Sequence, residues 1–173
     1  SSTSRGLGDV YKRQIIVIKM SLFNLKDKSI LITGSSRGIG KSIARHSALM
    51  GANVIISSRK IDACKSAAKE INDEVGKEVA FPITCNIGDE NQLKNLVDET
   101  INLLGKIDTL VCNAATNTYM GSMLDMSNEQ FDKVIHNNIR SNQILCNLCL
   151  PHMIEKEDGS CLLYTSDAAD EGL

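Results

Sequence analysis

Short apolar runs alternate with longer segments of helical spacing along this chain, and that alternation limits the fold more than any other feature. The runs are rich in β-branched residues and occupy positions 29–33, 54–57, 79–84 and 109–112. Continuous apolar strands separated by helices are typical of a parallel sheet that helices cover on both faces. A chain of 173 residues has room for one such domain.

Individual prolines and glycines predict where these elements end. Pro82 interrupts the third run and predicts an edge strand, because proline cannot donate a hydrogen bond within a sheet. Pro151 predicts the end of a fifth helix, which starts near Asn128 and runs to Leu150. Glycines follow three helical segments shortly before the next strand, at Gly51, Gly76 and Gly105. Right-handed crossovers then predict the strand order 3-2-1-4 of a Rossmann-type doubly wound parallel sheet.

The first run leads directly into a glycine-rich turn that precedes a helix. Gly34 permits the tight turn, Gly38 lets the backbone approach a pyrophosphate, and Gly40 lets the helix lie close to the sheet. The helix N-terminus adds free N–H groups and a partial positive charge. This glycine spacing also occurs in ordinary turns, but its place between a strand and a helix favours dinucleotide binding.

A nucleoside-triphosphate loop is the competing interpretation. Gly40, Lys41 and Ser42 fit the end of its G-x-x-x-x-G-K-[ST] pattern. The first glycine of that pattern would stand at position 35, which is serine, and Gly34 is one residue too early. The core also offers no apolar strand ending in an aspartate that could hold Mg²⁺. This alternative is kept as the less favoured one.

The end of the second run indicates which dinucleotide is bound. An NAD site would place an acidic residue here, next to the ribose 2′-hydroxyl. The sequence instead continues Ser58, Arg59, Lys60. Arg59, helped by Arg37, would pair with a 2′-phosphate through charge-assisted hydrogen bonds. The pattern therefore predicts NADP(H) over NAD(H), although a basic pair at a strand end is also common on solvated surfaces.

Three motifs in order resemble the short-chain dehydrogenase/reductase family. They are the loop Thr33–Gly40, the fourth-strand segment 105–115 that ends Asn113-Ala114-Ala115, and the helix segment 138–141 that begins with Asn138. The resemblance covers about 25–160, and positions 57–60 and 113–122 look like those of NADP-dependent carbonyl reductases. It implies hydride transfer between a carbonyl and a secondary alcohol, on a small-molecule substrate, by a homo-oligomer.

The resemblance also implies a role for each matching position. Asn138 would hold a water that links to the catalytic lysine. Asn86 stands where family members often have aspartate, so this adenine contact departs from the pattern. The implied cofactor-binding residues are Gly34, Ser36, Arg37, Gly38, Ile39, Gly40, Ser58, Arg59, Lys60, Asn86, Ile87, Asn113, Ala114 and Ala115.

The catalytic centre that the family implies is incomplete in this sequence. Its chemistry needs a serine and a Tyr-x-x-x-Lys pair, in which the tyrosine moves the proton and the lysine lowers the tyrosine pKa. The residues four positions after the tyrosines (Tyr11, Tyr119 and Tyr164) are Ile15, Met123 and Ala168. We therefore expect this chain to bind the cofactor poorly and to catalyse nothing. A non-catalytic dinucleotide-binding protein remains the alternative.

Both ends of the chain are predicted to be foreign to the domain. Residues 9–14 can be encoded by GATGTGTATAAGAGACAG, and the reverse complement, read one base in, encodes residues 161–166. Both segments resemble adapters of transposase-made sequencing libraries. We interpret the chain as an N-terminal fragment with a non-native or read-through leader at 1–19, an incomplete dinucleotide-binding domain at 20–160 and a non-native tail at 161–173. The β-prone start of the tail is expected to pair in parallel with the fourth strand.

Cysteines and composition exclude several other classes. The six cysteines lie in apolar surroundings, which predicts buried, inert, reduced thiols and a cytoplasmic location. Cys146 and Cys149 have C-x-x-C spacing, but a zinc site would need a second pair, so no metal is expected. The net charge of −2 and the absence of tryptophan argue against nucleic acid or an anionic membrane as partner. No apolar run approaches the roughly 20 residues that span a bilayer.

Overall fold

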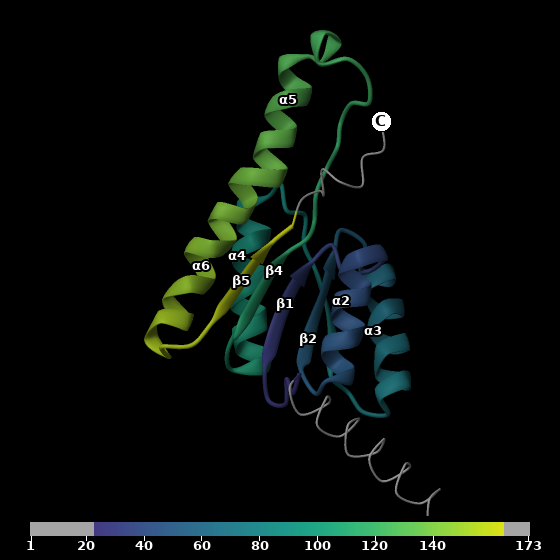
Figure 1. Ribbon diagram of the computed structural model, residues 1–173, viewed down its shortest axis with the longest axis vertical. Coiled ribbons are helices and arrows are strands. Elements are labelled where there is room, and N and C mark those ends of the chain that lie inside the picture. Colours follow the sequence, from purple (N-terminus) through teal and green to yellow (C-terminus); the bar gives the residue numbers. More distant parts are fainter. Residues whose placement is uncertain (1–22, 165–173) are drawn as a thin grey trace, which may run out of the picture.

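The computed structural model describes residues 23–164, which form a parallel sheet of five strands with helices on both faces (Figure 1). The leader predicted at 1–19 and the tail beyond 164 lie outside the described residues. In chain order the elements are β1 Ser29–Thr33, α2 Gly38–Leu49, β2 Asn53–Ser58, α3 Ile61–Val75, β3 Ala80–Thr84, α4 Glu90–Leu104, β4 Thr109–Cys112, the short turn η1 Met123–Asp125, α5 Asn128–Ile135, the π-helical turn η2 His136–Arg140, α6 Ser141–Glu155 and β5 Ser160–Leu163.

The order of the strands confirms the doubly wound arrangement. The sheet runs β3-β2-β1-β4-β5, and every neighbouring pair is parallel. Pro82 lies in β3, which is an edge strand as its lack of an N–H predicts. As expected, the start of the tail forms β5 in parallel with β4, and the structure places Cys161 opposite Leu110. All four residues of β5 are exposed.

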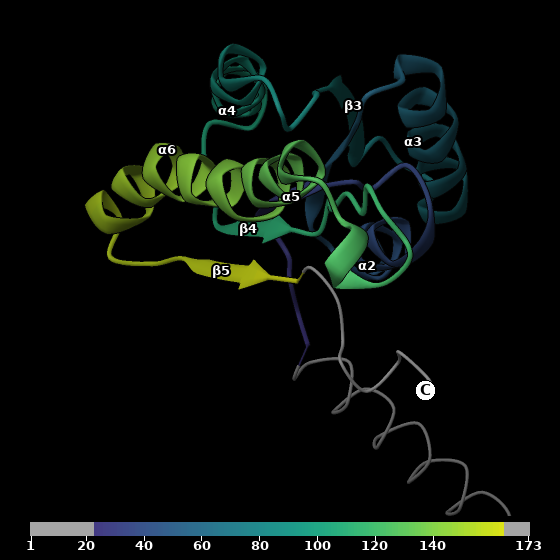
Figure 2. The same ribbon diagram turned by 90° about the horizontal axis from the view of Figure 1, so that it is seen from above.

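Two layers of core lie on either side of the sheet, because successive residues of a strand point to opposite faces. Ile30 and Ile32 of β1 pack in a cluster with α2 and α3, whereas Leu31 between them packs in a cluster with α4 and α6. Figure 2 shows the same division, with α2 and α3 on one side of the sheet and α4 and α6 on the other. The continuous apolar runs of the sequence therefore contribute side chains to the core on both faces of the sheet.

Helix ends follow local chemistry, with one exception. Gly76 and Gly105 adopt the left-handed conformation that ends α3 and α4, as predicted. The side chain of Asp89 begins α4 by accepting hydrogen bonds from the backbone N–H groups of Asn91 and Gln92.

The prediction that Pro151 ends the fifth helix is wrong. The helical segment is α5, η2 and α6 in succession, and Pro151 lies inside α6, which continues to Glu155. Proline removes one hydrogen bond and strains the preceding turn. Packing on both sides of it compensates, because Cys149 and Met153 are both buried in the core against the sheet. Tertiary burial thus overrides the local signal.

Candidate functional site

A cavity of about 820 Å³ lies where the loops after β1, β2, β3 and β4 meet. The carboxyl ends of parallel strands share one edge of the sheet, and this is where doubly wound folds bind ligands. In Figure 1 this edge faces the segment that carries η1 and α5. The cavity is lined by Gly34, Ser36, Arg37, Gly38, Ile39, Ser58, Arg59, Cys85, Asn86, Ile87, Gly88, Asn113, Ala115, Thr116, Lys133, His136, Asn137 and Tyr164.

The glycine loop after β1 is held in place by the loop after β4. The Asn113 side-chain amide donates to the carbonyl oxygens of Thr33 at 3.0 Å and Gly34 at 3.2 Å. A methyl group on Gly40 would lie 2.5 Å from that amide nitrogen and 2.6 Å from the Gly34 oxygen. Only glycine therefore fits at position 40, and the first residues of α2, Gly38 and Ile39, line the cavity.

A buried serine fixes the same loop to β2. The Ser35 hydroxyl donates to the Ile32 carbonyl oxygen at 2.7 Å and accepts from the Ser57 backbone N–H at 2.8 Å. Ser35 is fully buried, so both hydrogen bonds are shielded from water. This contact keeps the glycine loop and the end of β2, where Arg59 follows, in a fixed relation.

Positive charge dominates the wall of the cavity. Arg37 and Arg59 are exposed and line it from the first and second loops, and Lys133 lines it from α5. None of the described residues that line the cavity is acidic. Cationic side chains around a helix N-terminus favour a ligand that carries phosphate groups.

Most of the cofactor positions named from the sequence lie in this one cavity. Gly40, Lys60 and Ala114 are the exceptions among them, since they do not line it. Gly40 is buried beneath the loop, and Ala114 packs against Gly34, whose absent Cβ would lie 2.9 Å from the Ala114 Cα. Lys60 is exposed and precedes α3. Gly40 and Ala114 thus pack against the glycine loop without lining the cavity.

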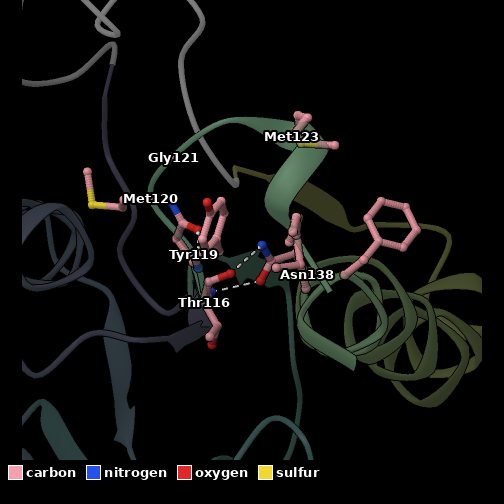
Figure 3. A pocket seen from close by; sticks show the side chains of 10 residues that line it. Thr116, Tyr119, Met120, Gly121, Met123 and Asn138 are labelled. Carbon is pink, nitrogen blue, oxygen red and sulfur yellow. Dashed lines mark hydrogen bonds between the residues drawn. The ribbon is translucent and has the colours of Figure 1, made fainter. Parts of the chain in front are cut away.

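Asn138 lies in an adjacent cavity of about 720 Å³ (Figure 3). Its side chain closes a pair of hydrogen bonds with the backbone of Thr116, accepting from the N–H at 2.8 Å and donating to the carbonyl oxygen at 3.0 Å. Thr116 lines both cavities, which therefore lie side by side. The walls are of mixed polarity: Met120, Met123 and Phe131 are apolar, whereas Asn117 and Asn138 are polar. This second cavity suits a small ligand that carries both apolar and polar groups.

The π-helical turn carries site residues that the sequence analysis missed. Asn137 donates to the Thr116 hydroxyl at 3.2 Å, and the His136 imidazole lies 3.1 Å from the Gly88 carbonyl oxygen. Lys133, His136 and Asn137 have the three- and four-residue spacing of one helical face, and this was the available signal. Tyr164 also lines the first cavity, although it belongs to the tail that was set aside as foreign.

The prediction that all six thiols are buried is wrong for two of them. Cys64, Cys85, Cys112 and Cys149 are buried, but Cys146 is half-buried and Cys161 is exposed. Burial raises the pKa of Cys85, in the wall of the first cavity, to about 12, and the nearby Asp89 charge adds to the shift. Among the residues that the structure describes, no three His, Cys, Asp or Glu side chains gather in a way that could hold a metal ion. Nor is any helix of 23–164 long and apolar enough to cross a membrane.

Comparison with known proteins gives a consistent family. The family model described as short chain dehydrogenase matches residues 28–173. A curated relative, dehydrogenase/reductase SDR family member 4 of Sus scrofa, is 34% identical over 145 residues, which are 84% of this chain and 51% of the relative. The chain thus spans about half the length of the curated relatives it matches.

Solved structures of similar fold hold either dinucleotide. A 7α-hydroxysteroid dehydrogenase complexed with NADH and 7-oxo glycochenodeoxycholic acid superposes with a TM-score of 0.79 at 35% identity, covering 87% of this chain and 58% of that one. A metagenomic short-chain oxidoreductase in complex with NADP superposes with a TM-score of 0.77 at 26% identity, covering 86% and 66%. The solved structures therefore do not distinguish NAD from NADP for this chain, and the distinction has to be argued from its own residues.

Proposed function

This chain belongs to the short-chain dehydrogenase family, and on that premise we propose that it is the cofactor-binding part of an NADP(H)-dependent oxidoreductase. The reaction we propose for the whole protein is the interconversion of a carbonyl and a secondary alcohol. The observation that supports it most strongly is the pair Arg37 and Arg59 in one cavity whose described lining residues include no acid. An acidic residue there would repel a 2′-phosphate.

The residues of the first cavity fit a dinucleotide part by part. The loop 34–40 and the start of α2 would hold the pyrophosphate with backbone N–H groups. Arg59, with Ser58 and Arg37 beside it in the cavity wall, would hold the 2′-phosphate, and Lys60, outside the cavity, would add positive charge. Asn86 and Ile87 would lie by the adenine. Asn113 and Ala115 would line the nicotinamide side, with Ala114 packed against the glycine loop between them. Ser36 and Ile39 complete the wall between the two ends.

The second cavity is the proposed place for the substrate. A nicotinamide bound beside it would supply the hydride chemistry: the reduced form would give a hydride to a carbonyl carbon, and the oxidised form would take one from an alcohol carbon. Thr116 lines both cavities, so a ligand in the second one that lies against Thr116 would be next to the nicotinamide side of the first. Asn138 is held there by its two hydrogen bonds to Thr116 and would position a water for proton transfer.

We propose that the chain as its sequence stands is inactive. Proton transfer in the family needs a tyrosine whose pKa a nearby lysine lowers, and no tyrosine of this sequence is followed by lysine at the fourth position. Tyr119 lines the second cavity, but its fourth following residue is Met123, which brings no positive charge. Cofactor binding therefore has to be measured directly, without turnover as the readout.

The proposal is tested by NMR titration of the isotopically labelled chain, since this method detects weak binding. NADPH without Mg²⁺ should shift the backbone amides of 34–40 and 58–59. Arg59→Ala should raise the Kd for NADPH by about tenfold, because one charge-assisted hydrogen bond at an exposed site is worth about 1.5 kcal/mol. The Kd for NADH should hardly change. Arg45→Ala is the matched control, since this arginine of α2 pairs with Glu74 of α3 and does not line the first cavity.

Each alternative function predicts a different outcome of that titration. A non-catalytic dinucleotide-binding protein would give the same NADPH response, and it would be distinguished by a parent gene that continues without Tyr-x-x-x-Lys. A nucleoside triphosphatase would respond to Mg-ATP at Gly40, Lys41 and Ser42. Equal responses of wild type and Arg59→Ala to NADPH would contradict the assigned role of Arg59.

Assembly and location remain proposals. Phe131, Ile135 and Ile139 of the α5–η2 segment are exposed apolar residues, which supports a homo-oligomer of the parent protein through this helix. The buried thiols Cys64, Cys85, Cys112 and Cys149 support a reducing, cytoplasmic location.

A further inference from the structure

Two cysteines from different elements meet at one edge of the sheet, where α6 lies beside the edge strand β5. The Sγ atoms of Cys146, on α6, and Cys161, on β5, lie 3.6 Å apart. Residues 146 and 161 are 15 positions apart in sequence, so the contact joins a helix to the edge strand across the turn between them. The pair belongs to the chain as its sequence stands, with the tail included.

We propose that Cys146 and Cys161 form an intramolecular disulfide when the chain meets a small-molecule disulfide such as oxidised glutathione. Neither sulfur takes part in the proposed dinucleotide or substrate site, so the inference is independent of the proposed function. Cys161 is exposed and can meet the reagent, and Cys146 is half-buried directly behind it. Both are free thiols in this structure.

The other nearby thiols are poorer partners. Cys149 shares the C-x-x-C spacing with Cys146, but it is fully buried against the sheet. Burial raises the pKa of Cys149 to about 12 and raises the pKa of Cys112 further. Because Cys149 and Cys112 are buried, the reagent cannot reach them, so these two thiols should stay reduced.

The exchange proceeds in two balanced steps. The Cys161 thiolate attacks one sulfur of glutathione disulfide, the S–S bond breaks, and one glutathione leaves as a thiolate. The Cys146 thiolate then attacks the Cys161 sulfur of the mixed disulfide and releases the second glutathione. The two protein thiols are oxidised, glutathione disulfide is reduced to two thiols, and the two protons of the protein thiols end on glutathione.

The reaction should be slow at neutral pH and faster in base. Burial, followed by the hydrogen bond to Cys146, raises the pKa of Cys161 to about 11. The thiolate fraction of Cys161 therefore grows about tenfold per pH unit until the pH approaches that value. The rate of cross-linking should follow the same rise.

The cross-link would fix the edge strand beside the first cavity. The β5 strand leads directly to Tyr164, which lines that cavity. The Tyr164 backbone N–H donates to the Cys112 carbonyl oxygen at 3.0 Å. All residues of β5 are exposed and no further strand of the described chain covers it. A bond to α6 would hold β5 against fraying and should slow hydrogen exchange of its amides.

Peptide mapping of the whole chain tests the proposal. The chain is incubated with oxidised glutathione, free thiols are alkylated, and trypsin cleaves after Arg140 and Lys156. Cys146 and Cys149 then lie on one peptide and Cys161 on another, so the expected product is a linked pair of peptides that is two hydrogen atoms lighter than their sum. Cys146→Ser should abolish this link, and Cys149→Ser, the matched control, should retain it.

Several results would overturn the proposal, and the wild-type chain alone can give them. One is a stable mixed disulfide with glutathione at Cys161 and no linked peptide. Another is a Cys146–Cys149 bond within one peptide, and a third is a covalent dimer through Cys161 on a non-reducing gel. If the linked peptides do not form when the chain is oxidised in urea, the expected product depends on the folded arrangement of α6 and β5.

Discussion

Gly40→Ala tests the packing of the glycine loop most sharply, because two opposite effects compete at this position. Alanine is favoured over glycine inside a helix by about 1 kcal/mol, and Gly40 lies in the first turn of α2. The new methyl group would lie 2.6 Å from the Gly34 carbonyl oxygen and 2.5 Å from the Asn113 amide nitrogen. Real Cβ atoms do not approach so closely, so the loop or the amide has to move.

The net effect should be a clear loss of stability. Overpacking costs about 1–3 kcal/mol. Displacing the Asn113 side chain breaks hydrogen bonds of 3.0 and 3.2 Å to Thr33 and Gly34, at about 0.5–1.5 kcal/mol each. Against the gain in helix propensity, the free energy of unfolding should fall by about 1–5 kcal/mol.

Urea unfolding followed by circular dichroism measures this change. Gly76→Ala is the control, since Gly76 has a positive φ of 76° but has no atom within 4 Å of the new methyl group. It should lose about 1–2 kcal/mol from backbone strain alone and keep its response to NADPH. Gly40→Ala should lose that response as well. A Gly40→Ala chain that is as stable as wild type, or more stable, would refute the packing argument.

Two further changes test the core and the start of α4. Leu31→Ala should lower the free energy of unfolding by about 2–5 kcal/mol, because Leu31 is fully buried, whereas Leu163→Ala on exposed β5 should change it by less than about 0.5 kcal/mol in urea titrations. Hydrogen bonds from Gln92, first its backbone N–H and then its side chain, lower the pKa of Asp89 below its usual 3.8. The ionised Asp89 carboxylate therefore stabilises the fold fully above about pH 4, and this stabilisation is lost as the pH falls through the lowered pKa. In Asp89→Asn the urea midpoint should accordingly fall less steeply between pH 4 and pH 2 than in wild type. Equal acid sensitivity of the two chains would contradict this account.

The strand order and the glycine positions could be predicted because they follow from local patterns. Apolar runs of four to six residues, Pro82 in the third run and the glycine loop each depend on neighbouring residues only. The same is true of Arg59, whose place at the end of β2 follows from where the run stops. These features correctly indicated the edge of the sheet where the first cavity lies.

The remaining features depend on contacts between distant segments. The π-helical turn brings Asn137 and Asn138 to Thr116, more than 20 residues away. The spacing of His136 and Asn137 after Lys133 indicated a shared helical face, but not the π-helical geometry or the contact with Thr116. Pro151 stays helical because Met153 beyond it is buried. The exposure of Cys161 follows from its position on an edge strand, although the residue itself is of a type that is usually buried.

The central claim is that this chain recognises a 2′-phosphate, and a pair of small ligands tests it most directly. Adenosine 2′,5′-bisphosphate and adenosine 5′-monophosphate differ only in that group, so their Kd values for the wild-type chain isolate its contribution. The account predicts that the bisphosphate binds about tenfold more tightly in low salt, through Arg59 and Arg37, and that raising the salt reduces the difference. Equal Kd values for the two ligands, or tighter binding of the monophosphate, would contradict it.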